Sequence, residues 1–128
     1  MNLNQITIPV SNIEQSIEFY EKLGLKLIVK DVHYARFECI NGESTFSIHH
    51  AENMPADTGV WIYFEVEDVD DKISELLRRG FVIEELPADK PWLWREARIK
   101  DLDNHLLIIY HAGDNRKNPP WRINEQPF

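Results

Sequence analysis

The amino-acid sequence repeats its own pattern at an offset of 56 residues. Residues 5–25 align with residues 61–81 without a gap, and Gly24 falls on Gly80. Each copy begins with an alternating strand, continues as an amphipathic helix and enters a further apolar strand after the glycine. A chance likeness of two strand–helix units is the alternative, but the ungapped match and the same later order of elements favour a repeat. The matching apolar positions are Ile6 with Ile62, Val10 with Val66, Ile13 with Val69 and Ile17 with Ile73.

Each copy predicts the element order β-α-β-β-β, which makes the fold class α+β. Neither copy can bury both faces of its sheet alone, so we expect two tandem modules to form one curved mixed sheet. Ser11 with Glu14 matches a capping box, Asp68 suits the N-cap of the second helix, and Asn41-Gly42 predicts a hairpin turn. The predicted strands are 4–10, 26–30, 34–40 and 45–50 in the first copy, and 60–66, 82–86, 94–100 and 105–110 in the second.

The chain length of 128 residues, of which 43% are hydrophobic, suits one domain with its own core. The tail carries Trp121 and Phe128, and its two prolines exclude a helix or a central strand. The sequence leaves two alternatives open for this tail. Either it docks on the rest of its own chain or on a second subunit, or it is disordered. The expected divisions are a single domain at 1–112, with module one at about 3–52 and module two at about 58–112, and a polar tail at 113–128.

The net charge of −8, with scattered Lys and Arg, makes a nucleic acid or an anionic membrane an unfavourable partner. The single cysteine, Cys39, excludes an internal disulfide and a cysteine-based metal cluster, and suits a reducing compartment. The first ten residues read as a strand and not as a signal peptide, and no apolar stretch is long enough to cross a bilayer. We therefore expect a cytoplasmic protein.

Several short motifs resemble those of the glyoxalase/bleomycin resistance/dioxygenase superfamily, also called the vicinal oxygen chelate (VOC) superfamily. The resemblance covers roughly residues 3–112, and it implies two tandem β-α-β-β-β modules that form a cup. In metalloenzymes of the family, His or Glu residues from the first and last strand of each module hold a divalent ion. The motifs are Ile6 to Ile13, Ser16 to Tyr20 with Leu23-Gly24, Val66 to Val69, and Lys100 to Asn104.

The resemblance places the four metal-ligand positions on Gln5, Ser47, Trp61 and Ile108. Tryptophan and isoleucine carry no ligand atom, so this set cannot hold a divalent ion. We therefore expect no metal and no cofactor. Among the histidines, only His49 has the strand parity of the cup. We expect the others to be polar residues of the rim or surface: His33, His50, His105 and His111.

The inward parity of the four wall strands predicts an aromatic and apolar lining with a few hydrogen-bonding groups, which is typical of a small-molecule pocket. A closed core is the alternative, although its polar groups would each need a partner. The segment from Pro91 to Glu96 forms either a lip over the cup or a packed loop, and contains Trp94 and an Arg95–Glu96 couple able to form ion pairs. The predicted lining is Gln5, Thr7, Thr45, Ser47, His49, Trp61, Tyr63, Glu65, Leu106, Ile108 and Tyr110.

The preferred interpretation is a homodimeric protein that binds a small planar organic molecule without a metal, similar to the antibiotic-sequestering members of the family. Trp61, Tyr63 and Tyr110 would stack on the ligand, and Glu65 would meet a cationic group. The rival is an enzyme, either a metal-free lyase, isomerase or dioxygenase that uses His49 and Glu65, or a metalloenzyme with displaced ligands. The sequence leaves open whether any reaction is catalysed. No nucleophile–base motif accompanies Cys39, and no phosphate-binding glycine loop is present.

Overall fold

The computed structural model describes residues 1–123, and Asn124 to Phe128 lie outside the described residues. The chain divides into two compact units, each built on one copy of the repeat. Module one comprises residues 1–60 with the loop 101–105, and module two comprises residues 61–100 with the chain from residue 106. The two modules have the same strand order, which confirms the predicted fold class, but each module forms its own four-stranded sheet where one continuous sheet was predicted.

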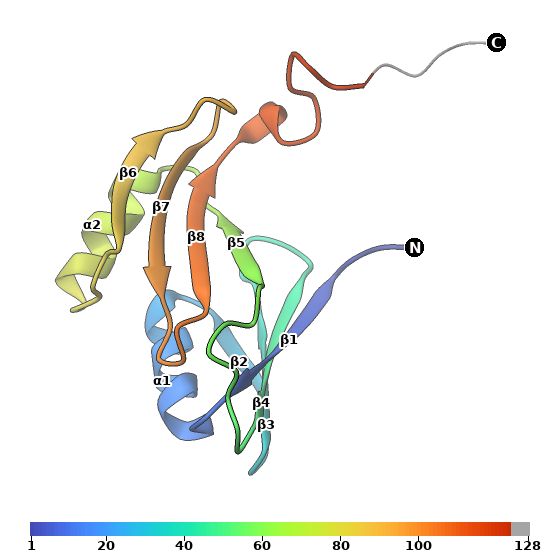
Figure 1. Ribbon diagram of the computed structural model, residues 1–128, viewed down its shortest axis with the longest axis vertical. Helices are drawn as coiled ribbons and strands as arrows, with labels where there is room; N and C mark the ends of the chain where they lie inside the picture. Colours follow the sequence, from blue (N-terminus) through green and yellow to red (C-terminus); the bar gives the residue numbers. More distant parts are fainter. Residues whose placement is uncertain (124–128) are drawn as a thin grey trace. The chain divides into compact units, whose positions relative to one another are not determined.

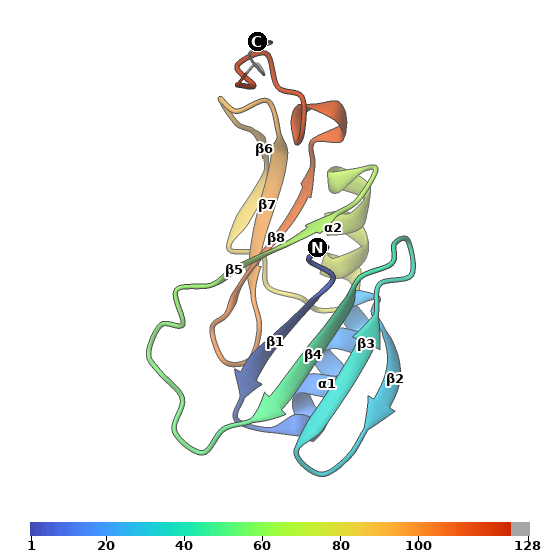
Figure 2. The same cartoon turned by 90° about the vertical axis from the view of Figure 1, so that its right-hand side faces the viewer.

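Module one contains a four-stranded mixed sheet in the order β1-β4-β3-β2. β1 runs parallel to β4, and the other neighbouring strands are antiparallel. Figure 2 shows this sheet face-on, with α1 lying against its far face. The elements are β1 (Gln5–Val10), α1 (Ile13–Leu23), β2 (Lys26–Lys30), β3 (Tyr34–Glu38) and β4 (Thr45–His50).

Module two repeats this arrangement in the order β5-β8-β7-β6, again with one parallel pair, β5 and β8. Its helix α2 lies against one face of this sheet, where it contacts β6 and β7 (Figure 1). The elements are β5 (Trp61–Glu65), α2 (Val69–Arg78), β6 (Glu85–Asp89), β7 (Arg95–Lys100) and β8 (Leu106–His111), followed by a short 3₁₀ helix at Gly113–Asn115.

The repeat extends to the hydrogen bonds that begin and end the helices. The side chain of Asn12 accepts from Gln15 N–H at the start of α1, and Asp68, its equivalent in the repeat, accepts from Asp71 N–H in α2. The predicted cap at Asp68 is confirmed, but the predicted capping box at Ser11 is wrong by one residue. Asn12, and not Ser11, is the N-cap of α1, because its short side-chain oxygen reaches the free N–H groups of the first turn.

A glycine with positive φ follows each helix: Gly24, the C-cap of α1, at 119°, and Gly80, directly after the C-cap Arg79 of α2, at 88°. In each case the N–H of the following residue bonds to a carbonyl five residues earlier, from Leu25 to Tyr20 at 3.1 Å and from Phe81 to Leu76 at 3.0 Å. A residue with a Cβ would be strained in this left-handed conformation. The glycines that revealed the repeat are therefore required by the helix ends.

Two local predictions are wrong. The turn between β3 and β4 is not a two-residue Asn41-Gly42 hairpin; the N–H of Cys39 bonds to Ser44 O at 3.1 Å across a longer loop. The strand predicted at 82–86 forms instead at Glu85–Asp89 and includes Pro87. Proline is tolerated there because β6 is the edge strand, and the register shifts between Glu85 and Ala88.

The core of each module lies between its helix and the helix-facing side of its sheet. Alternation along the strands sends every second side chain into this layer, where apolar burial contributes about 25 cal/mol for each Å² removed from water. The fully or almost fully buried residues are Ile8, Val10, Ile17, Tyr20, Phe37, Phe46 and Ile48 in module one, and Ile62, Ile73, Leu76, Ile99, Leu107 and Ile109 in module two.

One polar interaction is buried in the core of module one. The Tyr20 hydroxyl, 0% exposed, donates to Asp101 Oδ2 at 2.6 Å, while Asp101 Oδ1 accepts from the N–H groups of Asp103 and His105. Burial, followed by the charge of Asp101, raises the pKa of Tyr20 well above its usual value near 10. Tyr20 therefore ties helix α1 to the 101–105 loop as a neutral donor.

The substitution Tyr20→Phe removes this donor and leaves a buried carboxylate oxygen of Asp101 without a partner. We expect the free energy of unfolding, measured by urea denaturation at neutral pH, to fall by about 1–3 kcal/mol. The pKa of Tyr20 is higher in the folded state than in the unfolded state. The stabilisation that Tyr20 provides is therefore complete below the unfolded-state pKa and is lost as the pH rises above that pKa. The gap between wild type and variant should therefore narrow above about pH 10, by about 1.4 kcal/mol per pH unit. A gap that is independent of pH would contradict this role.

Candidate functional site

Strand β5 alternates between the core and the surface, as the sequence predicted. Ile62 is 6% exposed, whereas Trp61 is 57% and Tyr63 41% exposed. Glu65 lies on the same face as these two aromatic side chains. This face of module two, opposite α2, therefore presents large aromatic surfaces in an exposed setting.

Tyr63, Trp94 and Tyr110 form one aromatic cluster on this face. The rings of Trp94 and Tyr110 are stacked, with centroids 4.8 Å apart and an interplanar angle of 29°. The Tyr63 ring meets both edge-on, at 5.9 Å from Trp94 and 5.4 Å from Tyr110. Both arrangements are favourable for aromatic rings, so the cluster holds its own geometry. Within the cluster, Tyr110 is 6% exposed and packs with the buried Ile108 and Ala112, whereas Tyr63 and the neighbouring Trp61 are exposed.

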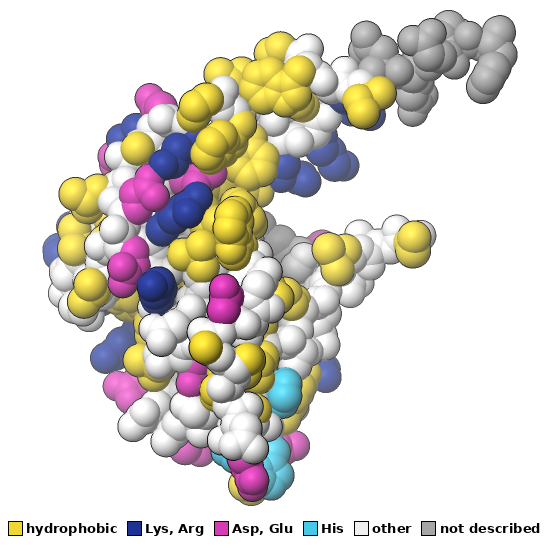
Figure 3. Space-filling view, in the orientation of Figure 1, with side chains coloured by type: hydrophobic (Ala, Val, Ile, Leu, Met, Phe, Trp, Pro, Cys, Tyr) yellow, Lys and Arg dark blue, Asp and Glu magenta, His cyan; other side chains and the backbone are white. Residues whose placement is uncertain are grey.

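Glu96 lies on the same face and was not among the predicted site residues. It pairs across the sheet with Tyr110 and is 1% exposed. Its Oε1 accepts from Trp92 Nε1 at 2.7 Å, and the guanidinium of Arg98 lies over the Trp61 ring, with Cζ 5.6 Å from the centroid. Strand parity from Trp94 would have found both Glu96 and Arg98, but β7 was not included among the wall strands. Figure 3 shows hydrophobic side chains gathered over β7 and β8, with charged groups beside them.

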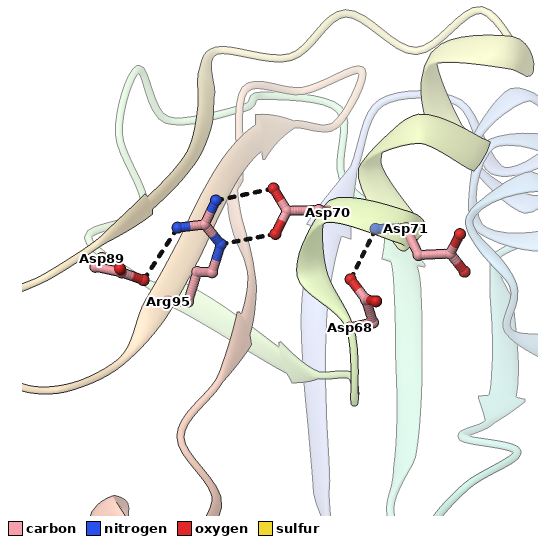
Figure 4. Close-up of polar contacts among 5 residues, drawn as sticks. All are labelled: Asp68, Asp70, Asp71, Asp89 and Arg95. Carbon is pink, nitrogen blue, oxygen red and sulfur yellow. Dashed lines mark hydrogen bonds and ion pairs between the residues drawn. The ribbon is translucent and has the colours of Figure 1, made fainter.

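The predicted Arg95–Glu96 couple does not form, because neighbouring residues of a strand point to opposite faces. Arg95 makes two hydrogen bonds to Asp70, each of 2.8 Å, and one of 3.0 Å to Asp89 (Figure 4). The hydrogen bond from Arg95 is the main cause that lowers the pKa of the Asp70 carboxyl. Arg95 therefore fastens α2 to the sheet, and Glu96 is left on the aromatic face. The segment 91–96 begins with an exposed turn at residues 91–93 and leads into β7.

Glu65 caps the chain that follows β8. Its Oε2 accepts from Ala112 N–H at 2.8 Å and from Gly113 N–H at 3.1 Å, at the start of the 3₁₀ helix. The first part of the tail is thereby held against module two, as is Asn115, whose carbonyl accepts from Trp94 Nε1 at 3.2 Å. Trp121 is 57% exposed, and Phe128, the other predicted tail anchor, lies outside the described residues.

The corresponding face of module one is polar instead of aromatic. Ser47 is 0% exposed and its Oγ lies 2.6 Å from the Tyr34 hydroxyl, which also accepts from Arg36 Nε at 3.0 Å. Gln5 Oε1 accepts from Thr45 Oγ1 at 2.7 Å. Thr7 and His49 are exposed on this sheet, and His49 Nδ1 lies 3.2 Å from His50 O. Two of the predicted residues of module one, Gln5 and Ser47, thus have side-chain hydrogen-bond partners on the same sheet. Tyr34 and Arg36, on β3, were not predicted.

The residues at the family's metal-ligand positions do not fit a metal ion. In module one, Gln5 and Ser47 use their oxygens in the hydrogen bonds just described, and in module two Trp61 and Ile108 have no ligand atom. Within residues 1–123, no three His, Cys, Asp or Glu side chains are grouped closely enough to hold a metal ion.

His105 contradicts the prediction of a rim or surface residue. It is 2% exposed, its Nε2 donates to Pro9 O at 2.6 Å, and its Nδ1 lies 3.3 Å from Thr58 Oγ1. The long-range partners satisfy both ring nitrogens, which is why the imidazole can be buried. His33 and His111 are exposed, as predicted for surface residues. Cys39 is half-buried, and burial raises the pKa of its thiol, which disfavours a reactive thiolate.

The comparisons with known proteins agree with this architecture. Residues 2–109 match the family model described as the Glyoxalase/Bleomycin resistance protein/Dioxygenase superfamily. The chain therefore belongs to this superfamily. A relative from Bacillus subtilis (strain 168), named Uncharacterized protein YraH, is 32% identical over 127 residues, which cover 86% of this chain and 98% of the relative.

Two solved structures have a similar fold. A bleomycin resistance determinant encoded on the transposon Tn5 superposes with a TM-score of 0.75 at 14% identity, covering 88% of this chain and 98% of that chain. A bleomycin-binding protein complexed with bleomycin superposes with a TM-score of 0.72 at 15% identity, covering 87% and 97%. At these identities the likeness extends to the fold alone. Separately, no helix within residues 1–123 has the length and apolar character to span a membrane.

The four tyrosines should ionise in two groups. Burial would raise the pKa of Tyr34, but hydrogen bonds with Ser47 and Arg36, and the Arg36 charge, outweigh it and lower the pKa. Burial is the first cause that raises the pKa of Tyr20, Tyr63 and Tyr110. In an alkaline titration followed by ultraviolet absorbance, we expect one tyrosine to ionise before the other three.

Tyr34→Phe should remove the first step of this titration. Arg36→Gln should move that step to higher pH, because it removes both a donor and a positive charge beside the phenolate. Four tyrosines that titrate together would show that the Tyr34–Ser47–Arg36 group does not form.

Proposed function

We propose that this protein binds a small planar organic molecule against the aromatic face of module two, without a metal. The observation that carries the proposal is the cluster of Tyr63, Trp94 and Tyr110, beside the exposed ring of Trp61. Exposed aromatic surface of this extent is costly in water, and flat rings with polar groups beside them are typical of small-molecule sites. This makes binding and sequestration of a ligand the favoured function.

The expected affinity follows from the interactions available. Stacking on an aromatic ring contributes roughly 0.5–1.5 kcal/mol beyond area burial. Together with the apolar area that a planar ligand would bury, this is consistent with micromolar binding, or about 8 kcal/mol. Glu65 stays in the proposal as a carboxylate on the same face, although its Oε2 already accepts two backbone N–H groups. We propose the polar face of module one, with Gln5, Thr7, Ser47 and His49, as a second surface able to form hydrogen bonds with a ligand.

Ligand binding is one of the functions that this fold hosts, and the residues at the metal-ligand positions favour it over the rival of an enzyme. One structure of the same fold is a bleomycin resistance determinant and another is a bleomycin-binding protein complexed with bleomycin. The donor set at the metal positions, with Trp61 and Ile108, does not support a standard metalloenzyme of the superfamily. The rival acid–base pair of His49 and Glu65 loses support because Glu65 caps the chain after β8.

Tryptophan fluorescence tests the proposal directly. A panel of aromatic cations, acids and neutral compounds should include ligands that change the emission. Trp61→Ala should weaken their binding by more than about tenfold, which is about 1.4 kcal/mol. Trp121→Ala is a matched control, because Trp61 and Trp121 are both 57% exposed. If no compound changes the emission, or if the Trp61 variant binds as well as wild type, the site is not on this face.

We also propose that the protein acts as a cytoplasmic homodimer. The exposed side chains of Trp121 and Ile123, at 57% and 90%, would be covered in a dimer, and the single cysteine suits a reducing compartment. Light scattering at micromolar concentration should give about twice the chain mass of 15.1 kDa. A mass equal to that of one chain would exclude the dimer and would leave the ligand proposal unaffected.

A further inference from the structure

Glu96 carries a buried oxygen that lacks a hydrogen bond. The side chain is 1% exposed, and its Oε1 accepts from Trp92 Nε1. Its Oε2 is also buried, but it has no hydrogen-bond partner among residues 1–123. Buried carboxylate oxygens are normally satisfied, because an oxygen that loses water and gains no donor destabilises the folded state.

The neighbouring charges compensate Glu96 without supplying that donor. Arg98 NH2 lies 3.6 Å from Glu96 Oε2, which is too long for a hydrogen bond. The same guanidinium also faces Glu85, with 3.4 Å between Arg98 Nε and Glu85 Oε2, and Glu85 is further paired with Lys90. Arg98 is therefore shared between two carboxylates, and its buried Nε also lacks a hydrogen bond.

The residue that carries this oxygen lies beside the surface proposed for stacking. Glu96 is directly opposite Tyr110 in the sheet, and Tyr110 stacks on Trp94. Burial, followed by the charge of Glu96, raises the pKa of Tyr63, so this phenol lies within the field of the carboxylate. A flat ring placed against the cluster would bring a substituent at its edge close to Glu96.

We infer that Glu96 determines the specificity of this site, and that its Oε2 accepts a hydrogen bond from a cationic N–H group on a planar ligand, such as an aromatic amidine or guanidine. This inference rests on the proposed function of the aromatic face. A planar cation with N–H donors at its edge supplies both missing elements, a donor for Oε2 and a flat surface for the rings. Charge-assisted hydrogen bonds are the strongest of the kinds available here.

Access to Oε2 requires side chains of this face to move. Trp61 is 57% exposed, so its ring borders solvent and has room to turn aside. Partly exposed side chains change rotamer on a fast timescale compared with ligand binding.

The experiment uses calorimetric titration of the full chain with three probes of one shape: naphthamidine, naphthamide and naphthoate. The first offers only donors and a positive charge, the second offers both a donor and an acceptor, and the third offers only acceptors. Wild type should bind naphthamidine about 10-fold to 100-fold more tightly than naphthoate, the range of one charge-assisted hydrogen bond.

Glu96→Gln should reverse this preference. Trp92 Nε1 needs an acceptor, so it keeps the amide oxygen in the place of Oε1, and the amide N–H₂ then takes the place of Oε2. The variant should lose affinity for naphthamidine and gain affinity for naphthoate. Naphthamide, which can present either group, should bind about equally to both proteins, and it reports that the variant remains folded.

Glu67→Gln is the matched control, because it removes the same charge from an exposed position in module two. Its probe preference should equal that of wild type. If Glu67→Gln and Glu96→Gln change the preference equally, the effect is one of net charge and the inference is overturned. Equal binding of all three probes to wild type also overturns it, but leaves the proposed function standing. If no probe binds at millimolar concentration, the proposed function itself fails.

Discussion

The hydrogen-bonded register between β7 and β8 determines the chemistry of module two. It sets Glu96 opposite Tyr110 and Arg98 opposite Ile108, on the face that also carries Trp61 and Tyr63. A slip of one residue would exchange the two faces of β7 and direct Arg95 toward the aromatic rings. The bonds from Arg95 to Asp70 oppose such a slip, because they fasten the other face of β7 to helix α2.

The two modules share a backbone plan but present different surfaces. Module two has stacked rings next to a buried carboxylate, and module one has a network of hydroxyl, amide and guanidinium groups around Tyr34. Both surfaces occupy the side of the sheet opposite the helix, where polar and aromatic side chains lie among a few buried apolar ones such as Ile108. Substitutions on this side therefore change the chemistry while the core and the helix ends keep the fold.

Glu96 shows how a binding function can oppose stability. A carboxylate that is 1% exposed, with one oxygen lacking a donor, contributes less to the folded state than an apolar residue of similar size would. Arg98 reduces the electrostatic cost but does not supply the hydrogen bond. Tyr20 and Asp101 form the opposite case, since every oxygen of that buried carboxylate has a donor. The first arrangement suits a site for a ligand, and the second suits a structural contact.

The sequence alone determined the features that depend on local periodicity. The offset repeat, the glycines at the helix ends, the Asp68 cap and the alternation that exposes Trp61 and Tyr63 follow from residues close together in the chain. The tertiary structure decided what depends on partners far along the chain. The burial of His105 against Pro9, the capping role of Glu65 and the oxygen of Glu96 that lacks a hydrogen bond are of this kind. Periodicity specifies which way a side chain points, but its hydrogen bonds and burial depend on which distant residues the folded chain brings beside it.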